Sequence, residues 1–463
     1  MKYVSTRGQA AAADFARVLL SGLAPDGGLY VPEAWPAFTS AEIAAFAGKP
    51  YAAVAAAVLS RFTGEAFPRA RLDAICHDAY ATFAHPAVTP LKQLDAGLFL
   101  LELFHGPTLA FKDVAMQLLA RLYDAVLAGK HRTLTVVCAT SGDTGGAAVE
   151  AFRGARHVRI VALFPEGRIS EVQRRFMTTA TDANVRTVAV DGSFDDCQAL
   201  VKAMFRDEAF RNQVDLSGVN SINWVRIAAQ AVYYFTSAVA LGAPHRPVRF
   251  AVPTGNFGDA FAGYAARRMG LDIERITVAT NSNDILARAL ASGRYTSGEV
   301  AATSSPAMDI QVASNFERLY FEASRRDAVE TSRAFETFAS EGLIDLAPQA
   351  LAYMRDGFDG WAVGEDETAR TILSTLNETG ELIDPHTAVG LAAARRTPSS
   401  RAPLVALSTA HPAKFPDAVR AATGAAPALH DRARSLFDKP ERIDRLPADI
   451  EAAKAYVRAF ARG

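Results

Sequence analysis

Three segments of the chain carry residue types that could do chemistry, and the first contains a lysine. It is FHGPTLAFKD, residues 104–113, in which Lys112 opens an apolar helical pattern. Apolar neighbours would partly desolvate the amine, and a helix N-terminus disfavours a positive charge, so both effects lower the pKa of Lys112. Such an amine can form a Schiff base near neutral pH. A surface lysine paired with Asp113 is the plain structural alternative.

The second segment is TSGDTGG, residues 140–146, which follows an apolar run and precedes the helical pattern AAVEAF. Its glycines let the backbone approach a ligand closely. The hydroxyls of Ser141 and Thr144, with the free amides of a helix N-terminus, suit a carboxylate or a phosphate. A capped strand-to-helix turn uses the same residue types, so the segment is ambiguous alone.

The third segment is TGNFGD, residues 254–259, in which Gly255 and Gly258 flank Asn256 and Phe257 ahead of another helical pattern. Backbone amides in such a nest can hold a phosphate ester, and a plain capped turn is again the alternative. The segment matches neither GxxxxGK[ST] nor GxGxxG. An activated lysine, a carboxylate-binding loop and a phosphate nest are together the parts expected around pyridoxal phosphate.

Short apolar runs, separated by helical patterns, must position these segments. The runs are TLTVVCAT (133–140), VRIVALFP (158–165), VRTVAV (185–190), VRFAVPT (248–254), ITVAT (276–280) and PLVALST (403–409). Strands that are apolar on both faces predict a buried, mostly parallel sheet of the α/β class. Ligands of such sheets bind beyond the carboxyl ends of the strands. Residues 1–95 and 281–400 read as mainly helical.

Composition excludes several classes of protein. The 463 residues are 50% hydrophobic and 21% charged, with a formal charge of −1, which predicts a globular protein with no electrostatic attraction to nucleic acid or to an anionic membrane. The N-terminal residues lack the apolar core of a signal peptide. Cys76, Cys138 and Cys197 are dispersed and predict reduced thiols, neither a disulfide framework nor a metal site. We therefore expect a cytoplasmic protein without a metal site.

The sequence resembles the threonine synthases, in the long form found in many bacteria and fungi. The resemblance covers nearly the whole chain and keeps the family's order of motifs. The matching segments are STRG (5–8), APDGGLYVPE (24–33), FHGPTLAFKDVAMQ (104–117), SGDTGGAA (141–148), DGSFDDCQALVK (191–202), NSINWVRIAAQ (220–230), PTGNFGD (253–259), PAMDIQVASNFER (306–318), DPHTAVG (384–390) and STAHPAKF (408–415).

The resemblance implies the α/β fold of fold-type II pyridoxal phosphate enzymes, with mostly parallel sheets flanked by helices and a helical N-terminal domain. We expect an N-terminal domain over residues 1–95, a catalytic region of two α/β subdomains over 96–425 and a helical extension over 426–463. The implied reaction converts O-phospho-L-homoserine and water to L-threonine and phosphate by γ-elimination and β-addition, the last step of threonine biosynthesis. The implied assembly is a monomer or a homodimer.

The resemblance also implies roles for single residues. Lys112 would hold the cofactor covalently and then move protons at the substrate carbons. Residues Gly255, Asn256, Phe257 and Gly258, with Asp259 beside them, would cradle the cofactor phosphate. Thr409 would reach the pyridine nitrogen, or Ser408 if the register differs by one residue. Asp143 matches the position near the cofactor's ring oxygen. The carboxylate and that oxygen would both be negative and would repel each other. Either they share a proton or the carboxylate points elsewhere.

The substrate would be held at both of its ends. Ser141, Thr144 and nearby amides are the candidates for its carboxylate. Arg226 with Asn223 is favoured for its phosphate, since a guanidinium matches a phosphate dianion. Arg7, Lys414 and His411 are weaker candidates for the same group, and each could equally be part of a structural ion pair or cap.

Three other functions compete with this hypothesis. The first is a lyase or dehydratase on the same scaffold that releases ammonia and a 2-oxo acid. The second is a nicotinamide-dependent dehydrogenase that uses residues 140–146 as its pyrophosphate turn, although GxGxxG is missing there. The third is a non-catalytic binding protein with the same fold.

Overall fold

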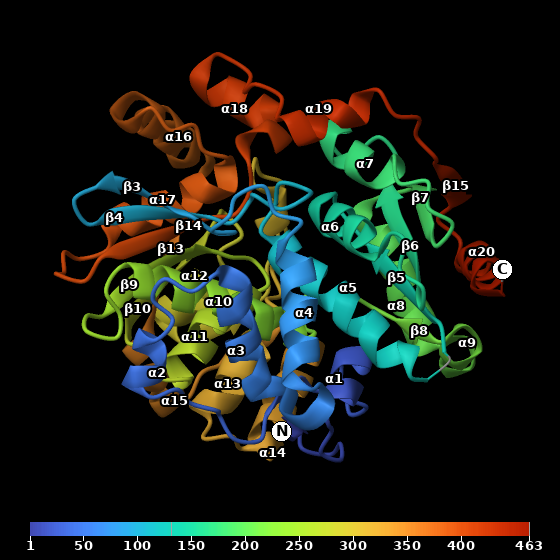
Figure 1. Ribbon diagram of the computed structural model, residues 1–463, viewed down its shortest axis with the longest axis horizontal. Helices are drawn as coiled ribbons and strands as arrows, with labels where there is room; N and C mark the ends of the chain where they lie inside the picture. Colours follow the sequence, from blue (N-terminus) through green and yellow to red (C-terminus); the bar gives the residue numbers. More distant parts are fainter. Residues whose placement is uncertain (131, 463) are drawn as a thin grey trace.

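The computed structural model describes residues 1–130 and 132–462, and two β-sheets organise them (Figure 1). The six-stranded sheet has the order β13 (Phe358–Ala362), β10 (Ile273–Thr280), β9 (Val248–Pro253), β14 (Leu404–Ser408), β4 (Leu98–Glu102) and β3 (Leu91–Asp95). The five-stranded sheet has the order β15 (Asp444–Pro447), β7 (Val185–Asp191), β6 (Val158–Pro165), β5 (Leu134–Ala139) and β8 (Leu216–Ser217).

Every pairing within these two sheets is parallel except that of β3 with β4. All six strands predicted from apolar runs are present, as β5, β6, β7, β9, β10 and β14. Their side chains are almost entirely buried on both faces, which parallel strands covered by helices require. The α/β fold class is confirmed.

Helices surround both sheets. The N-terminal ones are α1 (Phe15–Ser21), α2 (Ser40–Ala44), α3 (Tyr51–Thr63) and α4 (Arg69–Tyr80), with the 3₁₀ turn η1 (Gly64–Ala66). The others are α5 (Lys112–Ala128), α6 (Asp143–Phe152), α7 (Glu171–Thr178), α8 (Phe194–Arg206), α9 (Glu208–Val214), α10 (Trp224–Ala240), α11 (Gly258–Arg268), α12 (Ile285–Ser292), α13 (Phe316–Ala323), α14 (Ala328–Glu341), α15 (Pro348–Gly357), α16 (Glu365–Thr379), α17 (Pro385–Arg396), α18 (Pro416–Thr423), α19 (Asp431–Phe437) and α20 (Ile450–Arg462), with 3₁₀ turns η2 (Pro306–Met308) and η3 (Pro412–Lys414).

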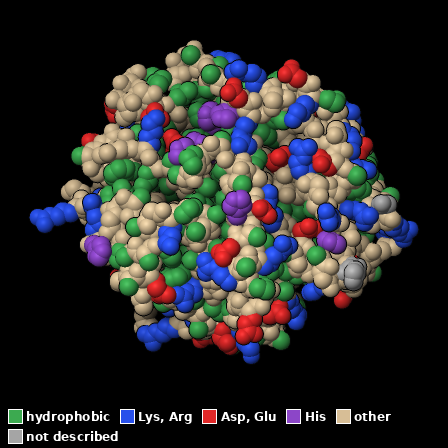
Figure 2. Space-filling view, in the orientation of Figure 1, with side chains coloured by type: hydrophobic (Ala, Val, Ile, Leu, Met, Phe, Trp, Pro, Cys, Tyr) green, Lys and Arg blue, Asp and Glu red, His purple; other side chains and the backbone are tan. Residues whose placement is uncertain are grey.

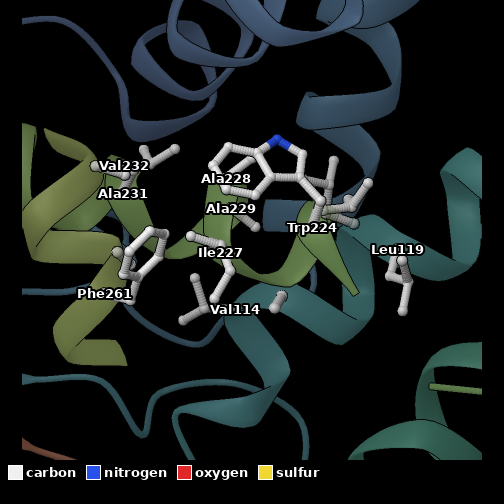
Figure 3. Close-up of a cluster of buried hydrophobic side chains, with 14 of the residues drawn as sticks. Val114, Leu119, Trp224, Ile227, Ala228, Ala229, Ala231, Val232 and Phe261 are labelled. Atoms are coloured by element: carbon white, nitrogen blue, oxygen red, sulfur yellow. The ribbon is translucent and has the colours of Figure 1, made fainter. Parts of the chain in front are cut away.

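Helix α10 lies at the centre of the largest apolar core and packs against α3, α5 and α11. Figure 3 shows Trp224, Ile227 and Val232 of α10 beside Val114 of α5 and Phe261 of α11. Because α10 is apolar on nearly all sides, it can be stable only when other helices enclose it. This packing connects the N-terminal helix α3 to α5 and α11, which begin at two of the candidate segments.

Two short strands lie outside the predicted pattern. Strand β3 falls within the predicted N-terminal domain, yet it pairs with β4 at the edge of the six-stranded sheet. Strand β15 falls within the predicted helical extension, yet it pairs with β7. Both carry polar residues with partly exposed side chains, as edge strands commonly do, so neither produces an apolar run. Two further pairs of short strands are antiparallel: β1 (Tyr3–Ser5) with β2 (Tyr30–Pro32), and β11 (Arg294–Thr296) with β12 (Leu343–Asp345).

The surface has no dominant sign of charge on the face drawn in Figure 2, where Lys and Arg side chains are interspersed with Asp and Glu. This distribution agrees with the formal charge of −1. Within residues 1–130 and 132–462, no helix is long and apolar enough to cross a bilayer.

Candidate active site

A cavity of about 370 Å³ lies between the two sheets, at the loops that follow β5, β9 and β14. These are the loops in which the sequence places candidate chemistry. The candidate residues among those that line the cavity are Lys112, Thr144, Arg226, Gly255, Asn256, Gly258, Asp259 and Thr409. The carboxyl ends of strands from both sheets thus bring together segments that are far apart in the chain.

Lys112 is the first residue of α5, and only 8% of its surface is exposed. A tight turn positions it, in which Asp113 accepts hydrogen bonds from the amide and hydroxyl of Thr108, both at 2.8 Å. Asp113 thus bonds to Thr108, and the carboxylate oxygen that faces Lys112 Nζ is Asp143 Oδ2, at 3.7 Å. The alternative interpretation, a surface lysine paired with Asp113, is wrong. Burial lowers the pKa of Lys112, although Asp143 opposes that shift.

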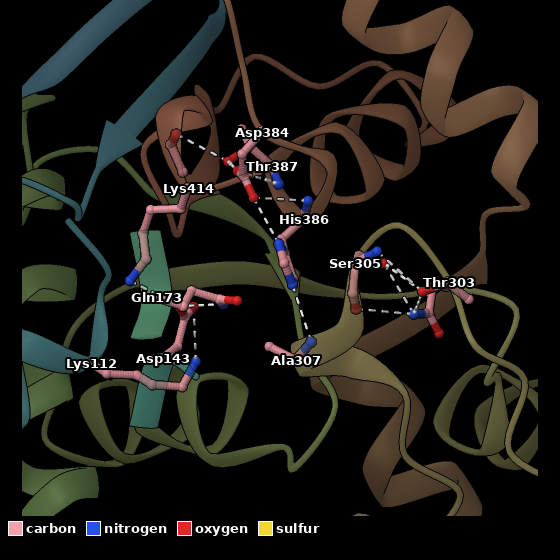
Figure 4. A network of polar contacts seen from close by, with 12 residues as sticks. Lys112, Asp143, Gln173, Thr303, Ser305, Ala307, Asp384, His386, Thr387 and Lys414 are labelled. Carbon is pink, nitrogen blue, oxygen red and sulfur yellow. Dashed lines mark hydrogen bonds and ion pairs between the residues drawn. The ribbon is translucent and has the colours of Figure 1, made fainter. Parts of the chain in front are cut away.

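The carboxylate of Asp143 lies between two lysines (Figure 4). Its Oδ1 is 2.8 Å from Lys414 Nζ and accepts a hydrogen bond from Gln173 at 3.0 Å. Burial by itself raises the pKa of this carboxyl, but Lys414 and Lys112 outweigh burial and hold the pKa well below its usual range. Asp143 is therefore ionised, and its charge is balanced by protein cations.

The loop between β9 and α11 has an unusual backbone. Phe257 has φ +63°, in the left-handed region that favours glycine, and its amide donates to Thr254 Oγ1 at 3.1 Å. The backbone and side-chain amides of Asn315 both donate to the carbonyl oxygen of Asn256 at 3.0 Å. A Cβ at Gly255 would lie 3.0 Å from Ile310 Cδ1 and 3.1 Å from Met308 Cα, so glycine allows close packing there.

Phe257 and Asp259 contribute to this loop in different ways. The ring of Phe257 packs against Phe358 in the core, so only its backbone can serve the cavity. Asp259 lines the cavity, and its carboxylate accepts hydrogen bonds from the Thr254 hydroxyl and the Ala260 amide. Burial raises the pKa of Asp259 despite these bonds, which reduces its repulsion of a nearby anion.

Thr409 and Ser408 are distinguished by their partners. Thr409 lines the cavity, and its carbonyl accepts a hydrogen bond from the amide of Phe111 at 2.8 Å. Ser408 Oγ lies 3.1 Å from Thr387 Oγ1, on the other side of the strand end. The side chains of successive extended residues point to opposite faces, so only one of the two reaches the cavity. This geometry favours Thr409 over Ser408.

Helix α6 begins at the edge of the cavity, with Thr144 in its first turn. Thr140 Oγ1 accepts from the amides of Gly142 and Gly145 at 2.9 and 2.8 Å, and so caps the helix. Gly142 has φ +131°, and a Cβ there would lie 2.6 Å from Gln173 Cδ. Ser141 is half-buried beside this turn and is not among the residues that line the cavity.

Arg226 reaches the cavity from α10 and is 4% exposed. One guanidinium nitrogen donates to the carbonyl of Val219 at 3.0 Å, and among the described residues Nε has no acceptor. Burial lowers the pKa of Arg226 to about 10, so the side chain remains positively charged near neutral pH. A buried cation with an unsatisfied donor is suited to an anionic ligand.

Four other predicted contacts with the substrate phosphate lie elsewhere. Asn223 caps α10, since its side chain accepts from the Val225 amide at 3.0 Å and donates to the Leu19 carbonyl at 2.8 Å. Asn223 is not among the residues that line the cavity, and its role as a phosphate ligand stays a prediction. Arg7 pairs with Glu317 at 3.0 Å. Lys414 contacts Asp143, and His411 Nδ1 accepts from the Ala413 amide at 3.2 Å.

Several residues that line the cavity were not predicted. Four of them, Phe194, Gln198, Val201 and Lys202, lie on one face of α8. Their helical spacing within DGSFDDCQALVK was a signal that could have been read. His386 also lines the cavity; its Nδ1 lies 2.7 Å from Asp384 Oδ2, and its Nε2 accepts from the Ala307 amide at 3.2 Å. Only the fold places this histidine in the same cavity as Lys112.

Across the part of the chain that the structure describes, no group of three or more His, Cys, Asp or Glu side chains could hold a metal ion.

Comparison with known proteins gives three family matches that together cover most of the chain. Residues 2–80 match the threonine synthase N terminus, residues 83–409 match the pyridoxal-phosphate dependent enzymes, and residues 387–457 match the threonine synthase C-terminal family. A threonine synthase of Pseudomonas aeruginosa is 49% identical over 459 residues, which cover 99% of this chain and 98% of the relative. A threonine synthase of Schizosaccharomyces pombe is 43% identical, and the match covers 91% of this chain and 89% of the relative.

Solved structures agree with these matches. The pyridoxal-phosphate-bound threonine synthase of Brucella melitensis superposes with a TM-score of 0.98 at 53% identity and covers 100% of both chains. The yeast threonine synthase superposes with a TM-score of 0.94 at 37% identity and covers 100% of this chain and 99% of the other. The nicotinamide-dependent alternative is therefore wrong. The chain belongs to the threonine synthase family of pyridoxal-phosphate-dependent enzymes.

Proposed function

We propose that this chain converts O-phospho-L-homoserine and water to L-threonine and phosphate, with pyridoxal phosphate bound at Lys112. One observation carries the proposal: a single cavity is lined by Lys112, the glycine loop of residues 255–258 and the buried guanidinium of Arg226. These supply an amine of lowered pKa, a place for a cofactor phosphate and a second, separate place for a substrate phosphate.

The residues around the cavity fit the cofactor. The loop at Gly255 and Gly258 opens α11, so its backbone amides and the helix N-terminus favour a phosphate. Thr409 would meet the ring nitrogen, and a hydroxyl there cannot keep that nitrogen protonated as a carboxylate would. Asp143 would face the ring side, with its charge already compensated by Lys414.

When bound, pyridoxal phosphate would draw electrons away from the α- and β-carbons of the substrate. Lys112 would then take a proton at the α-carbon and another at the β-carbon, because its long side chain can reach both once its nitrogen is free. The lowered pKa of Lys112 leaves the amine unprotonated more often and therefore able to accept these protons. The same nitrogen would return one proton to the γ-carbon after the phosphate has left, which gives the methyl group of threonine, and another to the α-carbon after water has added at the β-carbon.

The substrate would be oriented by contacts at both ends. Thr144 and the amides at the start of α6 would bind its carboxylate, with Ser141 as a second candidate. Arg226 would bind its phosphate from one side of the cavity, and Lys202 of α8 would approach from the other. A phosphate held between these cations leaves more easily from the γ-carbon, because its developing charge is stabilised.

Location and assembly belong to the same proposal. Three free, buried cysteines favour a reducing compartment, so we propose that the protein acts in the cytoplasm. We further propose a monomer or a homodimer, which light scattering of the purified protein would decide.

The decisive experiment supplies O-phospho-L-homoserine to the purified protein loaded with pyridoxal phosphate and measures four products. Equal amounts of phosphate and L-threonine support the proposal. Phosphate or water loss with ammonia and a 2-oxo acid would instead indicate the lyase or dehydratase. The absence of turnover, together with failure of the cofactor to attach to Lys112, would indicate a non-catalytic binding protein. Lys112→Ala is the matched control and should release none of the four products.

A further inference from the structure

A buried lysine that the proposed reaction does not use lies behind the cavity. Lys414 belongs to the 3₁₀ turn η3, and only 1% of its surface is exposed. Its Nζ donates to the carbonyl oxygen of Thr108 at 2.7 Å and lies 2.8 Å from Asp143 Oδ1. Lys414 is not among the residues that line the cavity. Asp143 does not line the cavity either, but it lies 3.7 Å from Lys112 Nζ, so Lys414 can influence a bound molecule through Asp143 and Lys112.

Asp143 connects this lysine to Lys112. Figure 4 shows the carboxylate with Lys112 on one side and Lys414 and Gln173 on the other. The three groups come from α5, η3 and α7, so three separate elements fix the position of the carboxylate. A buried carboxylate with these partners stays ionised, because the two lysines and the Gln173 donor together offset the cost of burying its charge.

Other charges face the same cluster. Arg226 of α10 and Asp259 of α11 lie on the side of Lys112, and they have opposite signs. Asp113 of α5 lies near Lys414, and burial raises its pKa to about 6. Among these groups, Lys414 is the one in direct contact with Asp143 and outside the reach of substrate. It is therefore placed to balance Asp143 independently of what the cavity holds.

We infer that Lys414 is a positioning residue that holds the Asp143 carboxylate in place and offsets part of its charge, and that the two residues together set how firmly the Lys112 nitrogen holds its proton. The inference rests on the proposed function, since the nitrogen concerned is the one that joins Lys112 to pyridoxal phosphate. An anion next to that nitrogen favours its protonated form, whereas a cation behind the anion disfavours it. Loss of Asp143 and loss of Lys414 must therefore act in opposite directions.

The test measures the visible absorbance of the bound cofactor against pH in the loaded protein, without substrate. We expect Lys414→Met to raise the midpoint of the spectral transition by about one pH unit, because a positive charge is lost. Asp143→Asn should lower the midpoint by a similar amount or more. Lys414→Arg retains the charge, so its midpoint should stay close to that of the unaltered protein.

An unchanged or lowered midpoint in Lys414→Met would overturn the inference, as would equal shifts in Lys414→Met and Lys414→Arg. Borohydride reduction followed by peptide mapping separates this failure from failure of the proposed function, which would appear as cofactor attached somewhere other than Lys112. If circular dichroism shows that Lys414→Met does not fold, Lys414→Gln replaces it, because an amide can still donate to Thr108 while carrying no charge.

Discussion

Asn315 donates two hydrogen bonds, from its backbone and its side-chain amide, to the carbonyl oxygen of Asn256, each at 3.0 Å. Asn315 does not line the cavity, yet it fixes the peptide between the two glycines of the loop 255–258. Arg318 in turn contacts the Asn315 side chain and donates to the carbonyl of Tyr30. The N-terminal segment is therefore connected to the proposed cofactor loop by polar contacts.

The first prediction follows from this contact. Asn315→Ala removes one of the two hydrogen bonds, worth about 1 kcal/mol, and lets the loop at Asn256 depart from its geometry. We expect roughly five- to tenfold weaker binding of pyridoxal phosphate, measured by fluorescence titration of the apo protein. Asn377→Ala, at an exposed position of α16, is the control and should bind as the unaltered protein does. Equal affinities in both variants would contradict the role of Asn315.

The second prediction concerns Arg226. Arg226→Met should weaken transition-state binding by about 2 kcal/mol, roughly a thirtyfold loss in kcat/KM for O-phospho-L-homoserine, because hydrogen bonds to a charged group are lost. Steady-state kinetics of phosphate release measures it. Arg370→Met, at an exposed position of α16, is the control and should leave kcat/KM unchanged. If Arg226→Met retains full activity, the substrate phosphate must bind elsewhere.

The third prediction concerns Gly142. An added Cβ would lie 2.6 Å from Gln173 Cδ at a backbone angle of φ +131°, which residues other than glycine rarely adopt. We expect Gly142→Ala to lower the free energy of unfolding by about 1–3 kcal/mol and to disturb the Gln173 contact with Asp143. Thermal unfolding measures the loss. Gly129→Ala adds a Cβ that meets nothing within 4 Å, so it should unfold like the original chain.

The fourth prediction is a dependence of stability on pH. Burial, together with nearby His430 and His105, lowers the pKa of His411 to about 4, while Asp384 and Glu102 oppose the shift. The unfolded chain binds a proton at this histidine near pH 6.5, whereas the folded chain does so only near pH 4. The contribution of His411 to stability is thus complete above pH 6.5 and is lost as pH falls through this window.

The measurement compares melting temperatures at pH 7 and pH 5. His411→Gln removes the titrating group, so we expect its melting temperature to fall less between the two pH values than that of the unaltered protein. His77→Gln is the control, since it also removes one histidine but at a side chain that is 77% exposed, so its melting temperature should fall as much as that of the unaltered protein. A variant His411→Gln with the full pH dependence would show that other groups dominate acid unfolding.

The amino-acid sequence by itself determined the fold class and most of the cavity. Runs such as VRIVALFP and VRFAVPT are apolar on both faces, and only a sheet covered on both sides can bury them, so the parallel strands β6 and β9 follow from local pattern. The segments around Lys112, Gly255 and Thr409 follow strand ends, and parallel topology brings such ends to one edge.

Only the tertiary structure decided which polar groups meet. Asp143 follows β5 of the five-stranded sheet, and Lys414 follows β14 of the six-stranded sheet. The two residues meet because the ends of these strands face each other, and no spacing along the chain encodes that contact. The side chain of Asn223, expected beside Arg226 at the substrate phosphate, caps the start of α10, a contact that only the folded chain reveals. Residues that do chemistry can be recognised by type and local position, whereas their charge balance depends on partners that folding brings from distant segments.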